Sequence, residues 1–134
     1  MRSRTALLIR CAEKEAATIR EQARNERRTV SNYVLNIVVR AVQFEASLFA
    51  NSRFRELRRR AYLHVLRAPG PRTAILVRCS TEEAEWIRAS AEQRGATISG
   101  YVLRALTRSW KIKKGVAALA SRERMKPYRE FYTV

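Results

Sequence analysis

Apolar and polar positions alternate with a period of two in two short segments of the chain, residues 5–11 (TALLIRC) and residues 73–79 (TAILVRC). Side chains of a β-strand point alternately to its two faces, so each segment predicts a strand with one uniformly apolar face. The opposite face carries Leu8 and Leu76 and ends in arginine both times. If the faces were reversed, Leu8 and Leu76 would be buried and the more apolar face would meet water, which is the less favourable arrangement. The apolar face consists of Leu7, Ile9 and Cys11 in the first segment and Ile75, Val77 and Cys79 in the second.

A helical period follows each predicted strand. Alanine and isoleucine recur at three- and four-residue spacing over residues 13–26 and 81–94, which predicts an amphipathic helix in each place. Ser80 and Glu83 have the spacing of a capping box at the start of the later helix. Ala12 holds the equivalent place before the earlier helix and is a weaker cap, because it has no side-chain oxygen.

A tight turn and a second helix are expected after each of these helices. Gly95 suits the positive φ with which many helices end, and Arg27 holds the same place in the first half. Thr29 and Thr97, which open TVSNYVLNIV and TISGYVLRAL, are candidate N-caps. The predicted buried stripes are Val30, Val34, Ile37, Val38 and Ala41 in the first half and Ile98, Val102, Ala105, Leu106 and Ser109 in the second.

The two halves are copies of one another. Without a gap, residues 4–40 lie over residues 72–108, and 17 of the 37 pairs are identical. Two copies are too few for a solenoid. A lone strand leaves its apolar face and its backbone groups unpaired, whereas two strands that pair antiparallel across a two-fold axis satisfy both. We therefore predict a mostly α-helical fold with a two-stranded antiparallel ribbon, in which two tandem strand–helix–helix units form an intramolecular pseudo-dimer.

The predicted pairing determines where the two cysteines lie. If the ribbon is centred near Leu8 and Leu76, Cys11 and Cys79 are six residues apart along it, or ~20 Å at ~3.3 Å per residue. We therefore predict no disulfide between them and interpret both as small core residues.

The chain divides into four predicted segments. The two units fold together as one domain, and between and after them lie a helical connector that ends in a Pro-Gly turn and a basic, aromatic tail. The boundaries are 1–42 for the first unit, 43–71 for the connector, 72–110 for the second unit and 111–134 for the tail.

The connector and the tail carry weaker signals. Residues 53–67 have a helical pattern and contain RFRELRRR, which is either a solvated helix face or a source of extra phosphate contacts. APGP at 68–71 is a break before the second strand. The tail predicts a short helix near 115–125, and the aromatic residues after Pro127 either pack on the body or bind a partner protein.

The charge of the chain changes the picture from fold to partner. Its 28 basic and 12 acidic residues give a formal net charge of +16, which predicts a polyanionic partner. The cysteines do not form a ligand cluster, His64 stands alone, and we find no nucleophile–base pair or phosphate loop, so we expect no cofactor, no metal and no enzyme activity. No apolar run reaches the ~20 residues of a membrane span, and ALLI is too short for a signal peptide. We expect a cytoplasmic protein with reduced cysteines and no membrane partner.

The order strand–helix–helix, the strand that ends in Arg-apolar and the Thr-x-Ser before the second helix resemble the ribbon–helix–helix superfamily of Arc, MetJ and CopG. The resemblance covers about 37 residues in each half, and the tandem arrangement is similar to that of TraY-type accessory proteins. It implies that the paired strands enter the major groove of DNA. Arg10 and Arg78 would each bind O6 and N7 of a guanine, and Leu8 and Leu76 would contact thymine methyl groups. The implied base-contacting residues are Ala6, Leu8, Arg10, Ala74, Leu76 and Arg78.

The resemblance also implies phosphate contacts at the N-terminus of each second helix. Free amides and the positive end of the helix dipole favour an anion there. Such contacts position a protein on the duplex without reading its sequence. The implied phosphate-contacting residues are Arg4, Arg27, Arg28, Thr29, Val30 and Ser31 in the first half and Arg72, Arg94, Thr97, Ile98 and Ser99 in the second.

The function expected from these features is that of a nucleoid-associated, sequence-preferring regulator of transcription, most simply a repressor. One unit pair reads a short site, so self-association on adjacent sites is expected. The halves differ, for example Asn32 against Gly100 and Asn36 against Arg104, so the site need not be palindromic. Two alternatives remain open: an antitoxin-type protein whose tail binds a partner, and an architectural or relaxosome accessory protein.

Overall fold

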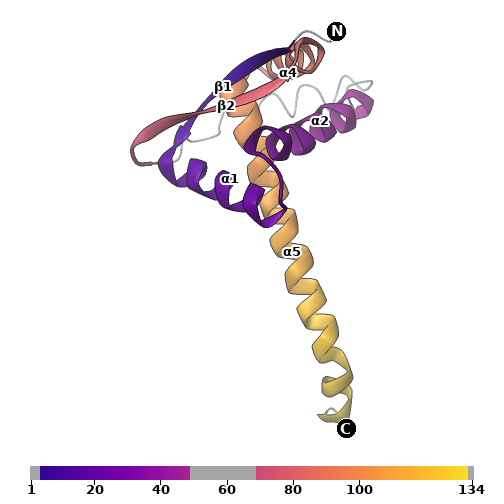
Figure 1. Cartoon of the computed structure of the whole chain (residues 1–134). Coiled ribbons are helices and arrows are strands. Elements are labelled where there is room, and N and C mark those ends of the chain that lie inside the picture. Colours follow the sequence, from indigo (N-terminus) through magenta and orange to yellow (C-terminus); the bar gives the residue numbers. More distant parts are fainter. Residues whose placement is uncertain (1–3, 49–68, 133–134) are drawn as a thin grey trace.

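The computed structural model describes residues 4–48 and 69–132 of the chain. Within these residues it contains four helices and a two-stranded antiparallel sheet, which confirms the predicted combination of helices and ribbon. Figure 1 shows the two strands lying across one side of the body, with the helices beneath them. The elements in chain order are β1 (Arg4–Ala12), α1 (Glu13–Asn25), α2 (Val30–Leu48), β2 (Arg72–Ser80), α4 (Thr81–Gln93) and α5 (Ile98–Tyr132).

The strands pair in the predicted register. Leu8 lies opposite Leu76 at the centre, and the pairing extends to Arg4 opposite Ser80 and Ala12 opposite Arg72. Each strand has nine residues, slightly more than the alternating segment alone predicts. The two cysteines are free and buried, and each lies opposite a threonine rather than opposite the other cysteine.

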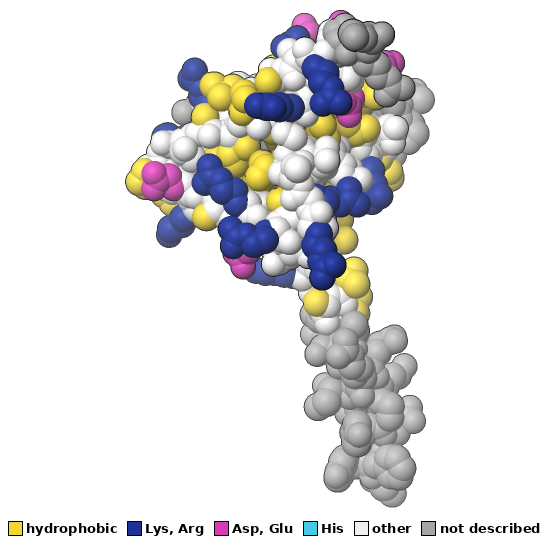
Figure 2. All heavy atoms as spheres, in the orientation of Figure 1, with side chains coloured by type: hydrophobic (Ala, Val, Ile, Leu, Met, Phe, Trp, Pro, Cys, Tyr) yellow, Lys and Arg dark blue, Asp and Glu magenta, His cyan; other side chains and the backbone are white. Residues whose placement is uncertain are grey.

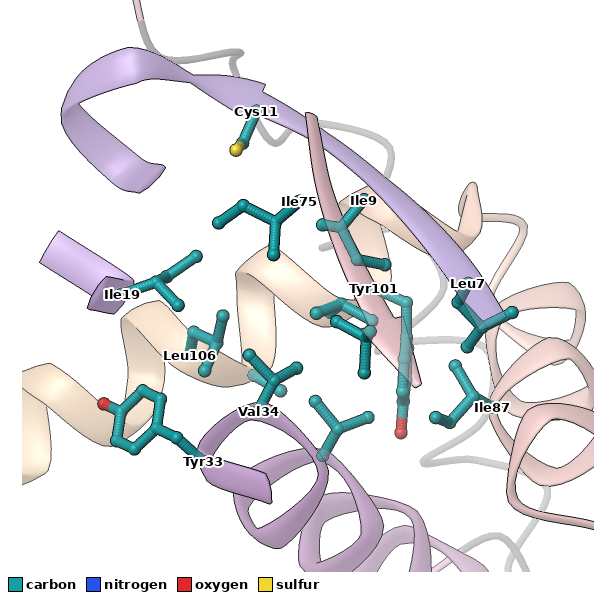
Figure 3. Close-up of a cluster of buried hydrophobic side chains, with 14 of the residues drawn as sticks. Leu7, Ile9, Cys11, Ile19, Tyr33, Val34, Ile75, Ile87, Tyr101 and Leu106 are labelled. Carbon is teal, nitrogen blue, oxygen red and sulfur yellow. The ribbon is translucent and has the colours of Figure 1, made fainter. Parts of the chain in front are cut away.

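The core lies between the inner face of the ribbon and the second helices α2 and α5. Figure 3 shows Leu7, Ile9 and Ile75 pointing from the strands into this layer, with Val34 of α2 below them. The strand alternation predicts these positions, and burying about six strand side chains supplies ~1.5–3 kcal/mol each. Tyr33 and Tyr101, which the sequence analysis left out of the core, are 2% and 0% exposed.

The stripes predicted for the second helices are deeply buried only in part. Within each stripe the side chains nearest the strands are buried, and the rest pack against the edge of the core. Ser109 is half-buried and belongs to neither group. Fully buried are Val34, Val38, Val102, Ala105 and Leu106, and partly buried are Val30, Ile37, Ala41 and Ile98.

The first helices begin as the cap residues predict. Ser80 Oγ accepts a hydrogen bond from the backbone N–H of Glu83 (3.1 Å), and the Glu83 carboxylate accepts one from the N–H of Ser80 (3.0 Å). At α1 only the second half of this exchange exists, since Glu15 accepts from the N–H of Ala12 (2.9 Å) and Ala12 has no oxygen to offer. The same fold therefore forms with one complete cap and one incomplete cap.

The turn after each first helix uses the left-handed backbone region. Gly95 has φ +66°, as the sequence predicts. Arg27 has φ +55° at the equivalent position, although a side chain disfavours that region by ~1–2 kcal/mol. The first copy therefore accepts backbone strain that the second copy avoids.

The second helices run further than the sequence analysis predicts. α2 continues to Leu48, and α5 is a single 35-residue helix to Tyr132. The expectation of a separate short helix near 115–125 was wrong, because no break divides it from the helix that begins at Ile98. Figure 1 shows the C-terminal half of α5 projecting away from the rest of the molecule.

Several expectations lie outside the described residues. The helical pattern at 53–67, its arginine-rich stretch and His64 fall within the gap between 48 and 69. The side chains of Tyr128, Phe131 and Tyr132 are likewise not described, so a tail partner stays a prediction. The break before β2 is described from residue 69 onward, where Gly70 has φ +112°, a conformation that glycine adopts without strain.

Candidate nucleic-acid interface

The outer face of the ribbon is exposed along its whole length. Leu8 and Leu76 are 52% and 51% exposed, which excludes the reversed assignment of the strand faces. Exposed leucines at the centre of a surface are costly in water and indicate contact with something else. The six residues predicted to contact bases are all exposed on this face: Ala6, Leu8, Arg10, Ala74, Leu76 and Arg78.

The two outward arginines are placed symmetrically about the central leucines. Arg10 lies opposite Ala74, and Arg78 lies opposite Ala6. The two guanidinium-bearing positions are therefore four residues apart along the ribbon, or ~13 Å at ~3.3 Å per residue. The face presents an order of arginine, apolar centre and arginine.

The N-termini of α2 and α5 have the same local geometry. Thr29 Oγ1 accepts a hydrogen bond from the N–H of Asn32 (3.2 Å), and Thr97 Oγ1 accepts one from the N–H of Gly100 (3.0 Å). Both threonines are exposed and confirm the predicted N-caps. Neither helix has an acidic residue in its first turn, whereas α1 and α4 have two each, so the dipole of the second helices is left for an external anion.

Two serines join these helix ends to the ribbon. Ser31 Oγ accepts a hydrogen bond from the backbone N–H of Arg78, and Ser99 Oγ accepts one from the N–H of Arg10, both at 2.9 Å. Each bond links the second helix of one copy to the strand of the other copy. The predicted base-contacting and phosphate-contacting residues are thereby brought together on one continuous surface.

Sequence reasoning missed this structural role of the serines. The only signal was that Ser31 and Ser99 are identical in the two copies, and that signal does not distinguish a phosphate contact from a contact within the fold. Because a hydroxyl accepts and donates at once, the bond to the strand leaves the Ser31 and Ser99 protons for a second acceptor.

Positive charge is concentrated on the ribbon. The two strands carry Arg4, Arg10, Arg72 and Arg78 and no acidic residue. By contrast, α4 carries four glutamates and one arginine, and α1 carries three residues of each sign. Figure 2 shows Lys and Arg side chains distributed over one face of the body, with hydrophobic surface between them. The field above the ribbon is therefore positive while that above α4 is negative.

The remaining phosphate candidates differ in accessibility. Arg27 and Arg28 are exposed beside the N-terminus of α2, and Arg28 Nε lies 4.0 Å from the Glu26 carboxylate. Val30 and Ile98 are half-buried, so only their backbone N–H groups are suited to bind a phosphate.

The prediction for Arg94 was wrong. Its side chain is 2% exposed and forms an ion pair with the Glu45 carboxylate, itself 2% exposed. A guanidinium that is buried against a carboxylate is not available to DNA. The sequence gave no sign of this, because Glu45 is 49 positions upstream and an arginine at a helix end is usually solvated.

The thiols lie under the ribbon and are chemically quiet. Burial is the main cause that raises the pKa of Cys11 and of Cys79, and the nearby Glu15 and Glu83 carboxylates raise it further. A raised pKa keeps each sulfur protonated at neutral pH, and a protonated thiol is a poor nucleophile and a poor metal ligand. The cysteines therefore act as core residues.

Comparison of the chain with protein-family models, curated proteins and solved structures finds no match. Of the helices in residues 4–48 and 69–132, none combines the length and the apolar character needed to cross a bilayer.

Proposed function

We propose that this chain is a double-stranded DNA-binding protein of ribbon–helix–helix type, in which the two copies of the repeat act as one pseudo-dimer. The observation that carries the proposal is the outer face of the ribbon, where four arginines, no acid and two exposed leucines lie together. An antiparallel pair of strands fits the major groove of B-DNA. The two serine hydrogen bonds support the proposal because they hold a helix N-terminus beside each end of this face.

The geometry of the ribbon gives the proposed readout a definite form. Arg10 and Arg78 each bind a guanine through O6 and N7, and Leu8 and Leu76 contact thymine methyl groups between them. Their separation of ~13 Å corresponds to about four base pairs at ~3.4 Å per step. The proposed site therefore has two G·C pairs about four base pairs apart with A·T pairs between them.

The proposed biological role is sequence-preferring regulation of transcription at the nucleoid, by occupation of a promoter. One such site is short, so the proposal includes binding of further molecules at adjacent sites. Near the helix N-termini, Asn32 in one copy and Gly100 in the other make the two halves of the protein unlike, and the proposed site is accordingly not a perfect palindrome.

The salt dependence of duplex binding tests the proposed interface. Each lost phosphate contact reduces the slope of log K against log salt by ~0.9. Replacing Arg4 and Arg72 by alanine is expected to reduce the slope by up to ~1.8. The matched control is the replacement of Arg20 and Arg88, which are exposed at equivalent positions of α1 and α4 and remove the same charge. Equal slopes for the two double variants would show that the ribbon is not the DNA-binding face.

A further inference from the structure

Two ion pairs connect the ends of the first helices to the second helices of the opposite copy. Arg94, at the C-cap of α4, pairs with Glu45 of α2. Glu26, at the C-cap of α1, pairs with Lys113 of α5, whose Nζ lies 3.2 Å from Oε1 of Glu26. Each pair therefore joins one copy of the repeat to the other.

The two pairs occupy equivalent positions of the repeat with opposite charges. The copies are offset by 68 residues, so Glu26 corresponds to Arg94 and Glu45 corresponds to Lys113. In the first copy both positions are acidic, and in the second copy both are basic. Pairing of unlike copies therefore gives two attractive contacts.

Pairing of like copies gives the opposite result. Two first copies, from two chains in the same register, would place Glu26 against Glu45 twice, and two second copies would place Arg94 against Lys113 twice. The site of Glu45 and Arg94 is 2% exposed, so like charges there are not relieved by water. Removing a charge from water without an opposite partner is strongly unfavourable.

The groups around the ion pairs are adapted to the same assignment. Tyr101 donates its hydroxyl proton to Oε2 of Glu45 (2.8 Å), and its ring lies 5.9 Å from the Arg94 guanidinium. The equivalent Tyr33 instead accepts a hydrogen bond from Trp110 Nε1 (2.8 Å). Position 42, which corresponds to Trp110, is a valine and has no proton to donate. The two sides of the interface are therefore built for different partners.

We propose that this inverted pair of charges determines which copies associate: each copy accepts the unlike copy and rejects a second copy of its own kind. A symmetric dimer interface is self-complementary and would also join separate chains. Like-charge contacts against the wrong partner are a means of preventing this. The proposal concerns pairing between copies and does not depend on DNA binding.

A cysteine at the centre of the ribbon makes like-with-like pairing visible. Leu8 lies opposite Leu76 within the chain, so two first copies in the same register would place Leu8 opposite Leu8 of a second chain. Opposite residues of an antiparallel pair have Cα atoms ~4.5–5.5 Å apart, which suits a disulfide. In Leu8→Cys, only like-with-like pairing forms the interchain bond between the two ribbon cysteines.

The test compares this cysteine variant in two backgrounds of the full chain. Glu26→Arg with Lys113→Glu keeps both pairs within the chain attractive, but it makes the charges of the two copies alike. Like-with-like pairing then becomes attractive as well. After refolding at high protein concentration and mild oxidation, non-reducing electrophoresis is expected to show several-fold more covalent dimer in this background than with the natural charges.

Controls separate pairing from chance oxidation and from misfolding. Glu21→Arg with Lys111→Glu makes the same charge changes at exposed positions of α1 and α5 and is expected to leave the dimer yield unchanged. Leu8→Cys with Leu76→Cys reports folding, because the two cysteines close a bond within one chain. Glu26→Gln alone removes the repulsion without adding attraction and is expected to give an intermediate yield. Equal dimer yields for natural charges, Glu26→Gln and the charge-swapped background would overturn the proposal.

Discussion

The first and second copies of the repeat agree on the outer face of the ribbon and differ at the ends of their helices. Arg10 and Arg78, like Leu8 and Leu76, are identical, equally exposed and symmetrically paired. The ion pairs that join the copies are reversed in sign, and one is buried while the other is exposed. The comparison indicates that the ribbon has to present the same chemistry twice, whereas the helix ends have to make the copies unlike.

The largest expected effect breaks the comparison at the two ion pairs. Glu45→Ala leaves Arg94 buried without this carboxylate and is expected to lower the free energy of unfolding by ~3–5 kcal/mol. Lys113→Ala, at the equivalent position, removes an exposed pair and is expected to cost under ~1 kcal/mol. Urea unfolding of both variants measures the difference. Equal losses would show that burial of the Glu45–Arg94 pair has no energetic consequence.

The next effect concerns the face on which the copies agree. Arg10→Ala and Arg78→Ala are each expected to cost ~1–3 kcal/mol of binding to a preferred duplex and to relax preference at one base pair. Because the two arginines are equivalent, the two losses should be similar and should fall on different base pairs. Titration of duplexes with single base-pair changes measures both. Unchanged discrimination in both variants would contradict readout by the ribbon.

A smaller effect concerns the turns after α1 and α4. Gly95→Ala places a side chain at φ +66° and is expected to destabilise the fold by ~1–2 kcal/mol. Arg27→Gly relieves the equivalent strain and is expected to stabilise it by under ~1 kcal/mol, since glycine also loses more chain entropy on folding. Thermal unfolding should move in opposite directions for the two variants. A shift of the same sign in both would show that the turns are not equivalent.

The smallest effect sharpens the comparison at the helix starts. Ser80→Ala makes the cap of α4 like that of α1 and is expected to cost ~1 kcal/mol, because the N–H of Glu83 loses its acceptor. Gln93→Ala, at an exposed position of the same helix, serves as the control in chemical denaturation. A Ser80→Ala variant as stable as this control would show that the capping box contributes nothing.

Much of the fold was predictable because the signals are local or repeated. The alternation around Leu8 and Leu76 predicted the strands, their inner face and their register. The caps Thr29 and Thr97 and the turn at Gly95 follow from the backbone chemistry of those residue types. The six outward residues of the candidate site follow from the same alternation once the strands pair.

The rest depends on contacts that sequence periodicity does not contain. Arg94 was misplaced because its partner Glu45 comes from a helix of the other copy. The hydrogen bonds of Ser31 and Ser99 to the opposite strands likewise arise only when the copies associate. The length of α5 was missed because Gly115 and the basic residues around it suggest a boundary, yet neither prevents a helix from continuing at modest cost.

The central claim is that the ribbon reads a DNA sequence, and selection from a random duplex pool tests it most directly. The wild-type chain is incubated with the pool at physiological salt, and the affinity for the recovered sequences is compared with that for bulk DNA. The account predicts an enriched motif with two G·C pairs about four base pairs apart, A·T pairs between them and unlike flanks. Tight binding without any enriched motif would contradict it.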